Sequence, residues 1–479
     1  MIAGVRPSLR MRDPVVSWVA GVPEHWDVVR LRNAAEMRVS NVDKHSKADE
    51  QPVRLCNYVD VYKHDRIRSS MAFMGATATA DEIERFRLRP GDVLITKDSE
   101  TWNDIGVPAL VEDAADDLIS GYHLALLRPL LHRVDGRFLF RALQSAAVSH
   151  QFHVEANGVT RYGLSHSAIK SAWIPMPPLA EQGAIVRFLD YLDRRIRRYI
   201  GAKQKLIELL EEQKQAIINR AVTRGLDPDV RLKRSGVEWL GDVPEHWELR
   251  RNGRLFAQRN ETGFPDLPIL EVSLRTGVRV RDFENSDRKQ ALGDHAKYKR
   301  AAAGDIAYNM MRMWQGAVGI VPIGGLVSPA YVVARPLPDT ESRYFAHLFK
   351  TPAYMREVDK YSRGIVKDRN RLYWEDFTQI PSCCPPFAEQ VAIADAVAEV
   401  HEQTDGAVDR IRREISLLRE YRTRLVADVV TGKLDVREIA ALLTDDAQEP
   451  EPLAEAATFT GVEDGASDDL DVVSEAAEA

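Results

Sequence analysis

The sequence contains few cysteines and no long apolar run. Its only cysteines are Cys56, Cys383 and Cys384, which are too few for a disulfide framework and lack the usual ligand spacing of a zinc site. Because no run of about 18 apolar residues is present, no transmembrane helix is expected. The first ten residues also lack the apolar stretch and cleavage site of a signal peptide. These absences predict a cytoplasmic protein with no membrane partner.

The sequence motifs of common catalytic sites are also absent. There is no glycine-rich phosphate loop, no dinucleotide-binding glycine pattern, no His-Glu-x-x-His pair and no Gly-x-Ser-x-Gly turn. The segment Cys384-Pro-Pro-Phe387 resembles the Pro-Pro-aromatic loop of amino-methyltransferases, but it lacks the leading Asp, Asn or Ser and opens a long helix. The histidines show no clustered ligand spacing. The sequence therefore predicts no catalytic residue, no metal ligand and no cofactor in this chain.

Acidic residues are distributed unevenly along the chain. The formal net charge of the 479 residues is -7, which taken alone argues against a nucleic-acid partner. However, residues 445–479 contain twelve Asp or Glu and no Lys or Arg, a composition typical of a disordered, solubilising tail. Without this tail, 60 acidic residues stand against 65 basic ones, so residues 1–444 carry a net charge of +5. The folded part is expected to be mildly basic.

The chain contains an internal repeat. Three segments recur in the same order: Trp18-Val-Ala-Gly-Val-Pro-Glu-His-Trp26 as Trp239-Leu-Gly-Asp-Val-Pro-Glu-His-Trp247, Gly91-Asp-Val-Leu as Gly304-Asp-Ile-Ala, and Pro177-Pro-Leu-Ala-Glu-Gln182 as Pro385-Pro-Phe-Ala-Glu-Gln390. The last pair is separated by 208 residues. The Glu-His pairs between tryptophans could be metal ligands or acid–base groups, but we interpret them as part of an extended strap that covers a domain edge. The repeat indicates that the chain arose by duplication.

Each copy combines a mixed α/β part with a long helical part. Short apolar runs such as Gly91–Thr96 and Leu124–Leu127 are broken by Gly, Pro and Asp, which indicates strands. The expected fold class is α+β: two similar mixed α/β domains separated by two long antiparallel helices, related by an internal pseudo-two-fold repeat. The expected boundaries are residues 12–176 and 234–384 for the domains, 177–226 and 385–432 for the helices, and 445–479 for the tail.

The two helical segments show heptad spacing. Each helix is expected to begin at Pro-Pro-x-Ala-Glu-Gln, where Glu181 or Glu389 complements the helix dipole, and to end near Gly225 or Gly432. A helix of about 40 residues is roughly 60 Å long, and its apolar seam needs a partner. We predict an antiparallel coiled coil, with two unrelated surface helices as the alternative. The predicted seam consists of Ile185, Leu189, Leu192, Ile196, Tyr199, Leu206, Leu210, Ile217, Ile393, Val397, Val400, Ile411, Leu418, Tyr421 and Leu425.

These features together resemble the specificity subunits of Type I restriction-modification systems. The resemblance is carried by the doubled Val-Pro-Glu-His-Trp segment, the Gly-Asp-Val/Ile strands, the helix starts at 174–182 and 380–390 and the duplication, and it covers nearly all of residues 12–436. It implies that the two domains are target-recognition domains, each reading one half of a bipartite site in double-stranded DNA. It also implies that the helices set the spacer and dock two methyltransferase subunits, and that two restriction–translocase subunits join the complex.

The same resemblance assigns the chemistry to partner subunits. Adenine methylation with S-adenosylmethionine, and translocation and cleavage with ATP and Mg²⁺, would then take place outside this chain. Two other hypotheses remain open from the residues alone, namely a coiled-coil scaffold protein without DNA readout and a stand-alone DNA methyltransferase.

The segments that differ between the two copies are expected to contact DNA. The loops 97–103 and 309–315 follow the Gly-Asp strands and combine cationic, amide and aromatic groups, while the turns 158–163 and 364–369 are basic and suit phosphate. A solvated loop charge or a buried aromatic is the alternative for each residue. The arginine clusters at 194–198 and 410–413 are expected to be solvated faces or docking surface. The predicted DNA contacts are Lys97, Trp102, Asn103, Arg161, Asn309, Arg312, Gln315, Lys367 and Arg369.

Overall fold

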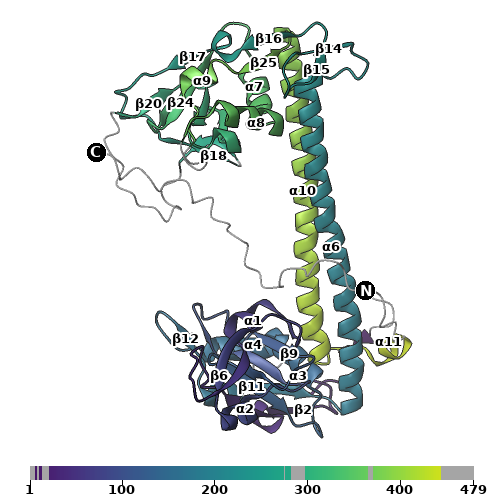
Figure 1. Cartoon of the computed structure of the whole chain (residues 1–479). Coiled ribbons are helices and arrows are strands. Elements are labelled where there is room, and N and C mark those ends of the chain that lie inside the picture. The colour runs from purple at the N-terminus through teal and green to yellow at the C-terminus, as the bar shows by residue number, and fades with distance from the viewer. Residues whose placement is uncertain are drawn as a thin grey trace. The chain divides into compact units, whose positions relative to one another are not determined.

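The chain folds into two compact units (Figure 1). The computed structural model describes residues 6–7, 10–12, 21–274, 276–281, 297–364 and 370–443. The first unit contains the described residues up to Lys205 and from Ile411 onwards, and the second contains those from Leu206 to Arg410. Each unit combines strands and short helices with portions of two long helices, α6 (Leu179–Arg224) and α10 (Phe387–Val430). The predicted mixed α/β architecture is confirmed.

A five-stranded sheet forms the centre of the first unit. Its strand order is β3 (Ala35–Val39), β11 (Leu124–Pro129), β7 (Val93–Thr96), β9 (Pro108–Val111) and β5 (Arg66–Ile67), and all neighbours are antiparallel except β5 and β9. A second sheet has the order β10 (Leu118–Ser120), β4 (Gln51–Cys56) and β6 (Met74–Ala78). The remaining strands form the pairs β12 (Tyr162–Gly163) with β8 (Asp98–Ser99), β13 (Trp173–Met176) with β2 (Asp27–Arg30), and β1 (Arg6–Pro7) with β26 (Leu434–Asp435).

Short helices surround these sheets. They are η1 (Leu31–Asn33), α1 (Tyr58–Lys63), α2 (Ala80–Phe86), α3 (Gly136–Gln144), α4 (Ala146–Glu155), α5 (His166–Ser171) and α11 (Arg437–Leu442). The two apolar runs that the sequence marks as strands are β7 and β11, and their apolar residues are fully buried. These strands therefore form the core to which the surface loops are attached.

The second unit has a four-stranded antiparallel sheet at its centre. The strand order is β17 (Phe256–Arg259), β24 (Tyr331–Pro336), β21 (Ile306–Asn309) and β22 (Val318–Ile320). The other strands pair as β14 (Leu232–Arg234) with β15 (Asp242–Pro244), β16 (Glu248–Arg251) with β25 (Pro381–Cys384), β18 (Leu270–Ser273) with β19 (Gly277–Val280), and β20 (Lys299–Ala301) with β23 (Gly325–Val327). Its short helices are η2 (Asn252–Arg254), η4 (Met313–Gln315), α7 (Ser342–Phe349), α8 (Pro352–Tyr361) and α9 (Trp374–Phe377).

The long helices begin and end where the sequence predicts. Within the first unit they run antiparallel, since Asp193 pairs with Arg422 and Lys203 pairs with Glu414. Within the second unit, Lys214 of α6 pairs with Asp405 of α10 at 3.0 Å, and Val222 shares a core with Ile393. No described helix is long and apolar enough to cross a membrane.

The buried stripe of these helices differs from the predicted seam at four positions. Tyr199, Leu206, Ile217 and Tyr421 are 53%, 45%, 41% and 43% exposed. Their neighbours Ile200, Ile218 and Arg422 are buried, and Ile207 is partly buried. At these four positions the more buried residue is the one that follows the predicted seam residue, so the seam assignment is corrected by one position. The reason is that the prediction uses a strict seven-residue spacing, from which a straight helix of 3.6 residues per turn drifts by about 20° per heptad. At Tyr421 the buried neighbour is also charged, so a search for apolar side chains passes over Arg422.

The other predicted seam residues lie inward to different degrees. Leu210, Val400 and Leu418 are partly buried. The buried ones are Ile185, Leu189, Leu192, Ile196, Ile393, Val397, Ile411 and Leu425.

The start of each long helix is held by the same set of hydrogen bonds. Glu181 accepts from the indole nitrogen of Trp26 at 2.9 Å and contacts His25 Nε2 at 2.8 Å. In the second unit, Glu389 accepts from Trp247 at 3.0 Å and contacts His246 Nε2 at 2.7 Å. The carboxylate at the helix start thus binds the Glu-His-Trp strap, which gives these residues a structural role.

The glutamine that follows each glutamate is buried and ties the helix to the domain. Gln182 donates to the carbonyl of Arg133 at 2.9 Å and accepts from the backbone N–H of Asp135 at 2.8 Å. Gln390 accepts from the backbone N–H of Glu341 at 2.9 Å in the same way. Since Asp135 and Glu341 cap α3 and α7, each glutamine fixes a short helix against a long one.

Candidate nucleic-acid interface

The predicted DNA-contacting residues of the first unit lie at one end of its central sheet. Lys97 directly follows β7, and its backbone N–H donates to the carbonyl of His123, just before β11, at 3.0 Å. The loop after β8 exposes Trp102 and Asn103. The chain returns to the same place after α4, because β12 pairs with β8 and the N–H of Leu164 donates to the carbonyl of Lys97 at 2.9 Å. This pairing brings exposed Arg161 to the same end of the sheet.

Asp98 organises the charged groups of this surface. Its carboxylate lies 2.7 Å from His123 Nδ1 and 3.2 Å from Lys97 Nζ. Both pairs are partly buried, with side-chain exposures of 18% for Asp98 and 20% for Lys97. The lysine and the imidazole are therefore held in place by one carboxylate, which limits their side-chain freedom before any ligand binds.

Aromatic residues that the sequence does not single out surround this charged group. Tyr122 is 50% exposed, and its ring lies 4.3 Å from that of His123. Tyr58 and Tyr62 of α1 stack at 5.4 Å, and Tyr62 donates to Asp104 at 2.6 Å. Burial and the Asp104 carboxylate raise the pKa of Tyr62, so its hydroxyl stays a donor. The only signal in the sequence is that Tyr122 and His123 directly precede the apolar run Leu124–Leu127.

The second unit places its predicted loop at the corresponding end of its sheet. Asn309 ends β21 opposite Tyr331, the first residue of β24. Gln315 is exposed, and Arg312 is partly buried with its guanidinium 3.4 Å from the Gln315 side-chain oxygen. Asn309 is only 3% exposed, and its Oδ1 accepts from the backbone N–H of Met311 at 2.9 Å. Asn309 therefore shapes the loop, and Arg312 and Gln315 are left as the side chains that can reach a ligand.

Lys367 and Arg369 lie outside the described residues, but the described residues that follow them contact the loop after β21. Arg363 and Arg371 form an antiparallel bridge across this segment, and both are exposed. The N–H of Leu372 donates to the carbonyl of Met310 at 2.8 Å, as Leu164 does to Lys97 in the first unit. The second unit thus adds Arg371, which the sequence does not single out, to the surface near Arg312.

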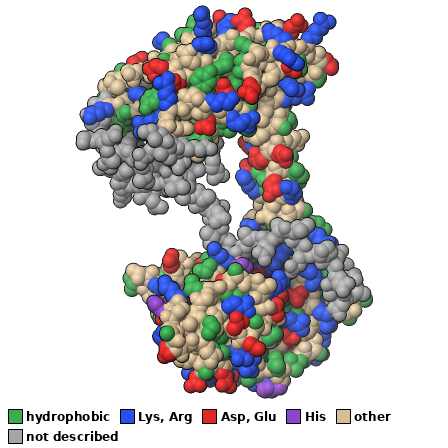
Figure 2. Space-filling model, in the orientation of Figure 1, with side chains coloured by type: hydrophobic (Ala, Val, Ile, Leu, Met, Phe, Trp, Pro, Cys, Tyr) green, Lys and Arg blue, Asp and Glu red, His purple; other side chains and the backbone are tan. Residues whose placement is uncertain are grey.

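Charge on the displayed face of the molecule is mixed. Figure 2 shows Lys and Arg side chains interspersed with Asp and Glu over both units. Within the described ranges, no group of three or more His, Cys, Asp or Glu side chains is arranged to hold a metal ion. The two candidate surfaces are therefore defined by the positions and types of their side chains.

Comparisons with known proteins match this architecture. Residues 23–209 match the family described as the Type I restriction modification DNA specificity domain. The relative named as the type I restriction enzyme MjaVIII specificity subunit of Methanocaldococcus jannaschii is 20% identical over 443 residues, which cover 87% of this chain and 95% of the relative.

Two solved structures share the fold. The HsdS subunit from Thermoanaerobacter tengcongensis is 17% identical, with a TM-score of 0.50, and the match covers 86% of this chain and 98% of that one. The second is a chain from a structure described for complex assembly and conformational transition of the type I R-M system. It is 15% identical, with a TM-score of 0.62, and the match covers 86% of this chain and 99% of that one. The fold therefore defines this molecule as an HsdS-like α+β protein. Residues 23–209 thus match a type I restriction-modification DNA specificity domain, and most of the chain is similar to type I restriction enzyme specificity subunits.

Proposed function

We propose that this chain selects the DNA sequence on which a type I restriction-modification complex acts. Each unit reads one half of a bipartite site in double-stranded DNA. The observation that carries this proposal is the matched placement of two divergent loops, after β7 and after β21, at the corresponding ends of two similar sheets. Side chains read the edges of the bases, whereas the sheet only positions those side chains. Two similar sheets that carry different side chains therefore suit two different half-sites.

The two units are proposed to be copies of one ancestral segment. The paired Glu–Trp and Gln–backbone bonds at the two helix starts, and the Leu164 and Leu372 bonds to the loops, occur in the same order along the chain. We propose that the internal repeat, a pseudo-two-fold one, gives the chain two related recognition surfaces, as expected for a reader of two half-sites.

We propose that α6 and α10 form an antiparallel coiled coil that sets the DNA spacer and docks two methyltransferase subunits. The ion pairs Asp193–Arg422 and Lys214–Asp405 support pairing of the helices in each unit. Beyond the first residue of each helix, the large apolar side chains that remain exposed are Tyr199, Leu206, Leu209, Ile217, Leu417 and Tyr421. Exposed apolar side chains of this number suit the docking of another protein.

The chemistry is proposed to reside in the partner subunits. Methylation with S-adenosylmethionine belongs to the methyltransferase subunits, and ATP- and Mg²⁺-dependent translocation and cleavage belong to two restriction–translocase subunits. The solved relative described for complex assembly of the type I system supports such partners. This chain then contributes binding and selection and no catalytic residue.

Methylation mapping in cells with and without this chain tests the proposal. We expect a bipartite adenine-methylation motif, two short defined blocks around an unspecified spacer, to disappear when the chain is deleted. An unchanged methylation pattern in cells that express the whole system would contradict it. Methyl transfer by the isolated chain would instead identify a stand-alone methyltransferase. A salt-independent or absent gel shift with the methyltransferase partner present would favour a scaffold without DNA readout.

Substitution of Arg312 tests the recognition surface of the second unit. If Arg312 contacts a base, Arg312→Ala weakens DNA binding by about 1–3 kcal/mol and relaxes selection at one position of one half-site. Binding of the assembled complex to a panel of single-base variants measures this. Arg254→Ala is the matched control, because Arg254 is an exposed arginine beside the opposite end of the same sheet. Uniform weakening would reassign Arg312 to phosphate, and no change would remove it from the interface.

A further inference from the structure

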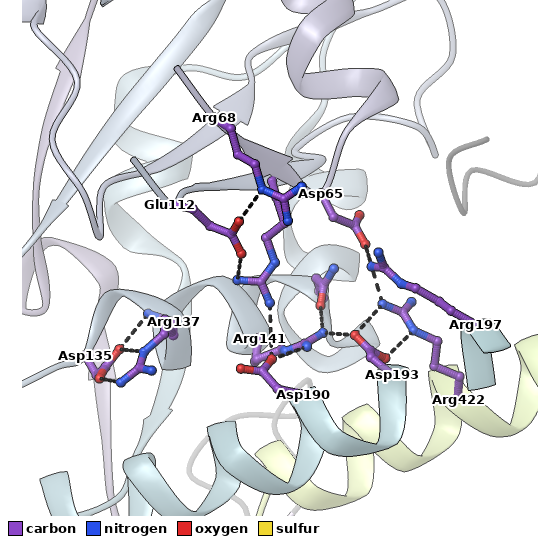
Figure 3. A network of polar contacts seen from close by, with 12 residues as sticks. Asp65, Arg68, Glu112, Asp135, Arg137, Arg141, Asp190, Asp193, Arg197 and Arg422 are labelled. Carbon is purple, nitrogen blue, oxygen red and sulfur yellow. Dashed lines mark hydrogen bonds and ion pairs between the residues drawn. The ribbon is translucent and has the colours of Figure 1, made fainter. Parts of the chain in front are cut away.

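In the first unit, the strands and short helices within residues 21–176 are called the recognition part. A buried cluster of charged side chains joins this recognition part to both long helices. Figure 3 shows Arg141 of α3, Asp190 and Asp193 of α6 and Arg422 of α10 pointing toward one another. Arg141, Asp193 and Arg422 are 1%, 5% and 8% exposed. Three elements that are far apart in the sequence therefore meet at one carboxylate, Asp193.

The geometry of this cluster is specific. Arg422 donates from Nε and Nη2 to the two oxygens of Asp193, at 2.7 and 3.2 Å. Arg141 Nη1 lies 2.6 Å from Asp193 Oδ2, and its Nη2 donates to Asp190 at 2.6 Å. Paired charge-assisted hydrogen bonds of this type constrain direction as well as distance. Asp193 consequently fixes both the spacing and the angle between α3, α6 and α10.

A second layer of ion pairs extends the cluster to the edge of the central sheet. Arg66 of β5 pairs with Asp190 at 3.1 Å and with Glu112 at 3.4 Å. Asp65, just before β5, pairs with Arg197 of α6 at 2.9 Å (Figure 3). The sheet that carries the candidate DNA surface is therefore coupled to the helices through the same group of charges.

The cluster is better explained by positioning than by stability. A buried ion pair contributes little net stability compared with apolar residues of the same size, because desolvation offsets the attraction. Burial alone would raise the pKa of Asp193, but Arg141 and Arg422 outweigh it and lower this pKa well below its ordinary value. The carboxylate thus remains charged at neutral pH, and its hydrogen bonds keep their direction.

The second unit has different residues at the corresponding places. By the 208-residue offset, Asp193 corresponds to His401 and Arg422 to Lys214. Arg141 corresponds to His347, because each lies six residues after the residue that caps its helix, Asp135 for α3 and Glu341 for α7. The rings of His347 and His401 stack at 5.5 Å. Lys214 pairs with Glu211 of its own helix at 2.6 Å and with Asp405 of α10 at 3.0 Å. The carboxylate that bridges three elements in the first unit is therefore replaced by an imidazole in the second.

We propose that Asp193 is a positioning residue that fixes the orientation of the recognition part of the first unit on its helices, and so restricts the spacer lengths that the complex accepts. This inference rests on the proposed function, since a spacer exists only for a bipartite site. Loosening the cluster frees the recognition surface to adopt several orientations, and half-sites at non-native separations can then be engaged.

The test compares the complete methyltransferase complex carrying the wild-type chain or Asp193→Asn. The DNA substrates hold both half-sites at the native spacer or at spacers one or two base pairs shorter or longer. We expect the methylation rate at altered spacers, relative to the native spacer, to rise about tenfold in the variant, which corresponds to about 1.4 kcal/mol of orienting free energy. A merely structural role would lower all rates together and leave this ratio unchanged, which would overturn the proposal.

Asp117→Asn is the matched control. Asp117 also binds an arginine through two hydrogen bonds, both 2.9 Å long, but its partner Arg54 lies within the recognition part. The control is expected to keep the wild-type spacer ratio, and an equal rise in the control would also overturn the proposal.

A second variant covers the case in which Asp193→Asn does not fold. Arg422→Lys keeps the charge but loses the planar, paired hydrogen bonds, and it is expected to raise the ratio in the same direction. An unchanged ratio there would overturn the proposal while leaving the proposed function intact. Absence of bipartite methylation by the wild-type complex would instead overturn the proposed function, and this inference with it.

Discussion

At the scale of single residues, the Glu-Gln pair that begins each long helix has two separate structural tasks. Glu181 and Glu389 hold the His-Trp strap, whereas Gln182 and Gln390 hold the loop before the next short helix. The glutamate and the glutamine are adjacent on the helix, so their side chains point in different directions and reach different partners. The histidines of the strap are engaged by these glutamates, which explains the Glu-His pairs without metal or acid–base chemistry.

His347 makes the stability of the second unit dependent on pH. Burial, together with His401, Lys350 and Arg343, lowers the pKa of His347 to about 4. The unfolded chain titrates near 6.5, so between about pH 6.5 and pH 4 the unfolded state binds more protons than the folded state, and stability falls as the pH falls. The full shift corresponds to about 3 kcal/mol.

Urea unfolding of the wild type and His347→Gln at neutral pH and at about pH 5 measures this effect. We expect the wild type to lose more stability than the variant on acidification. His166→Gln, at an exposed histidine, is expected to behave like the wild type. An identical pH dependence of wild type and His347→Gln would exclude His347 as the cause.

At the scale of elements, each long helix has an inner stripe and an outer stripe one residue apart. Ile200 is 3% exposed, whereas its neighbour Tyr199 is 53% exposed. Asp193 and Lys214 continue the inner stripe because their charges meet partners from other elements. A helix of this kind can pair on one side and present apolar side chains on the other.

The two stripes are expected to respond differently to truncation. Ile200→Ala removes buried apolar volume and should lower the free energy of unfolding by about 2–5 kcal/mol. Tyr199→Ala should change it by no more than about 0.5 kcal/mol, but should weaken association with the methyltransferase subunit. Denaturant unfolding and a titration of the two purified proteins measure both effects. Equal loss of stability in the two variants would contradict the assignment of the stripes.

At the scale of the whole molecule, the two units carry separate candidate recognition surfaces. Each has its own buried core, with one around Leu94 and Leu126 and another around Phe256 and Tyr308. Affinity for DNA is expected to come from a limited number of contacts in each unit and from partner subunits. A change in one surface should therefore leave the other half-site unaffected.

Combined substitution of Arg161 and Arg312 tests this independence. Arg161→Ala should weaken binding without changing sequence preference, as expected for a phosphate contact, and Arg312→Ala should act on the other half-site. Because the two residues belong to different units, the losses in binding free energy should add to within about 0.5 kcal/mol. Binding of both single variants and the double variant by the assembled complex completes the cycle. A larger interaction energy would show that the two surfaces act as one.

The sequence by itself determines the local features of this protein. Repeated motifs mark the duplication, proline and glycine mark the ends of α6 and α10, and the apolar runs mark β7 and β11. These features depend on residues close together along the chain, where propensity and periodicity act.

Only the tertiary structure decides which charged residues are buried and which aromatic residues surround a loop. Asp193, Lys214 and Arg422 lie inward because their partners come from other elements, and no periodic pattern records those partners. Tyr122 joins the surface around Lys97 because the pairing of β11 with β7 brings distant segments together. The physical reason is that a charge becomes tolerable inside a protein only where long-range packing supplies the opposite charge.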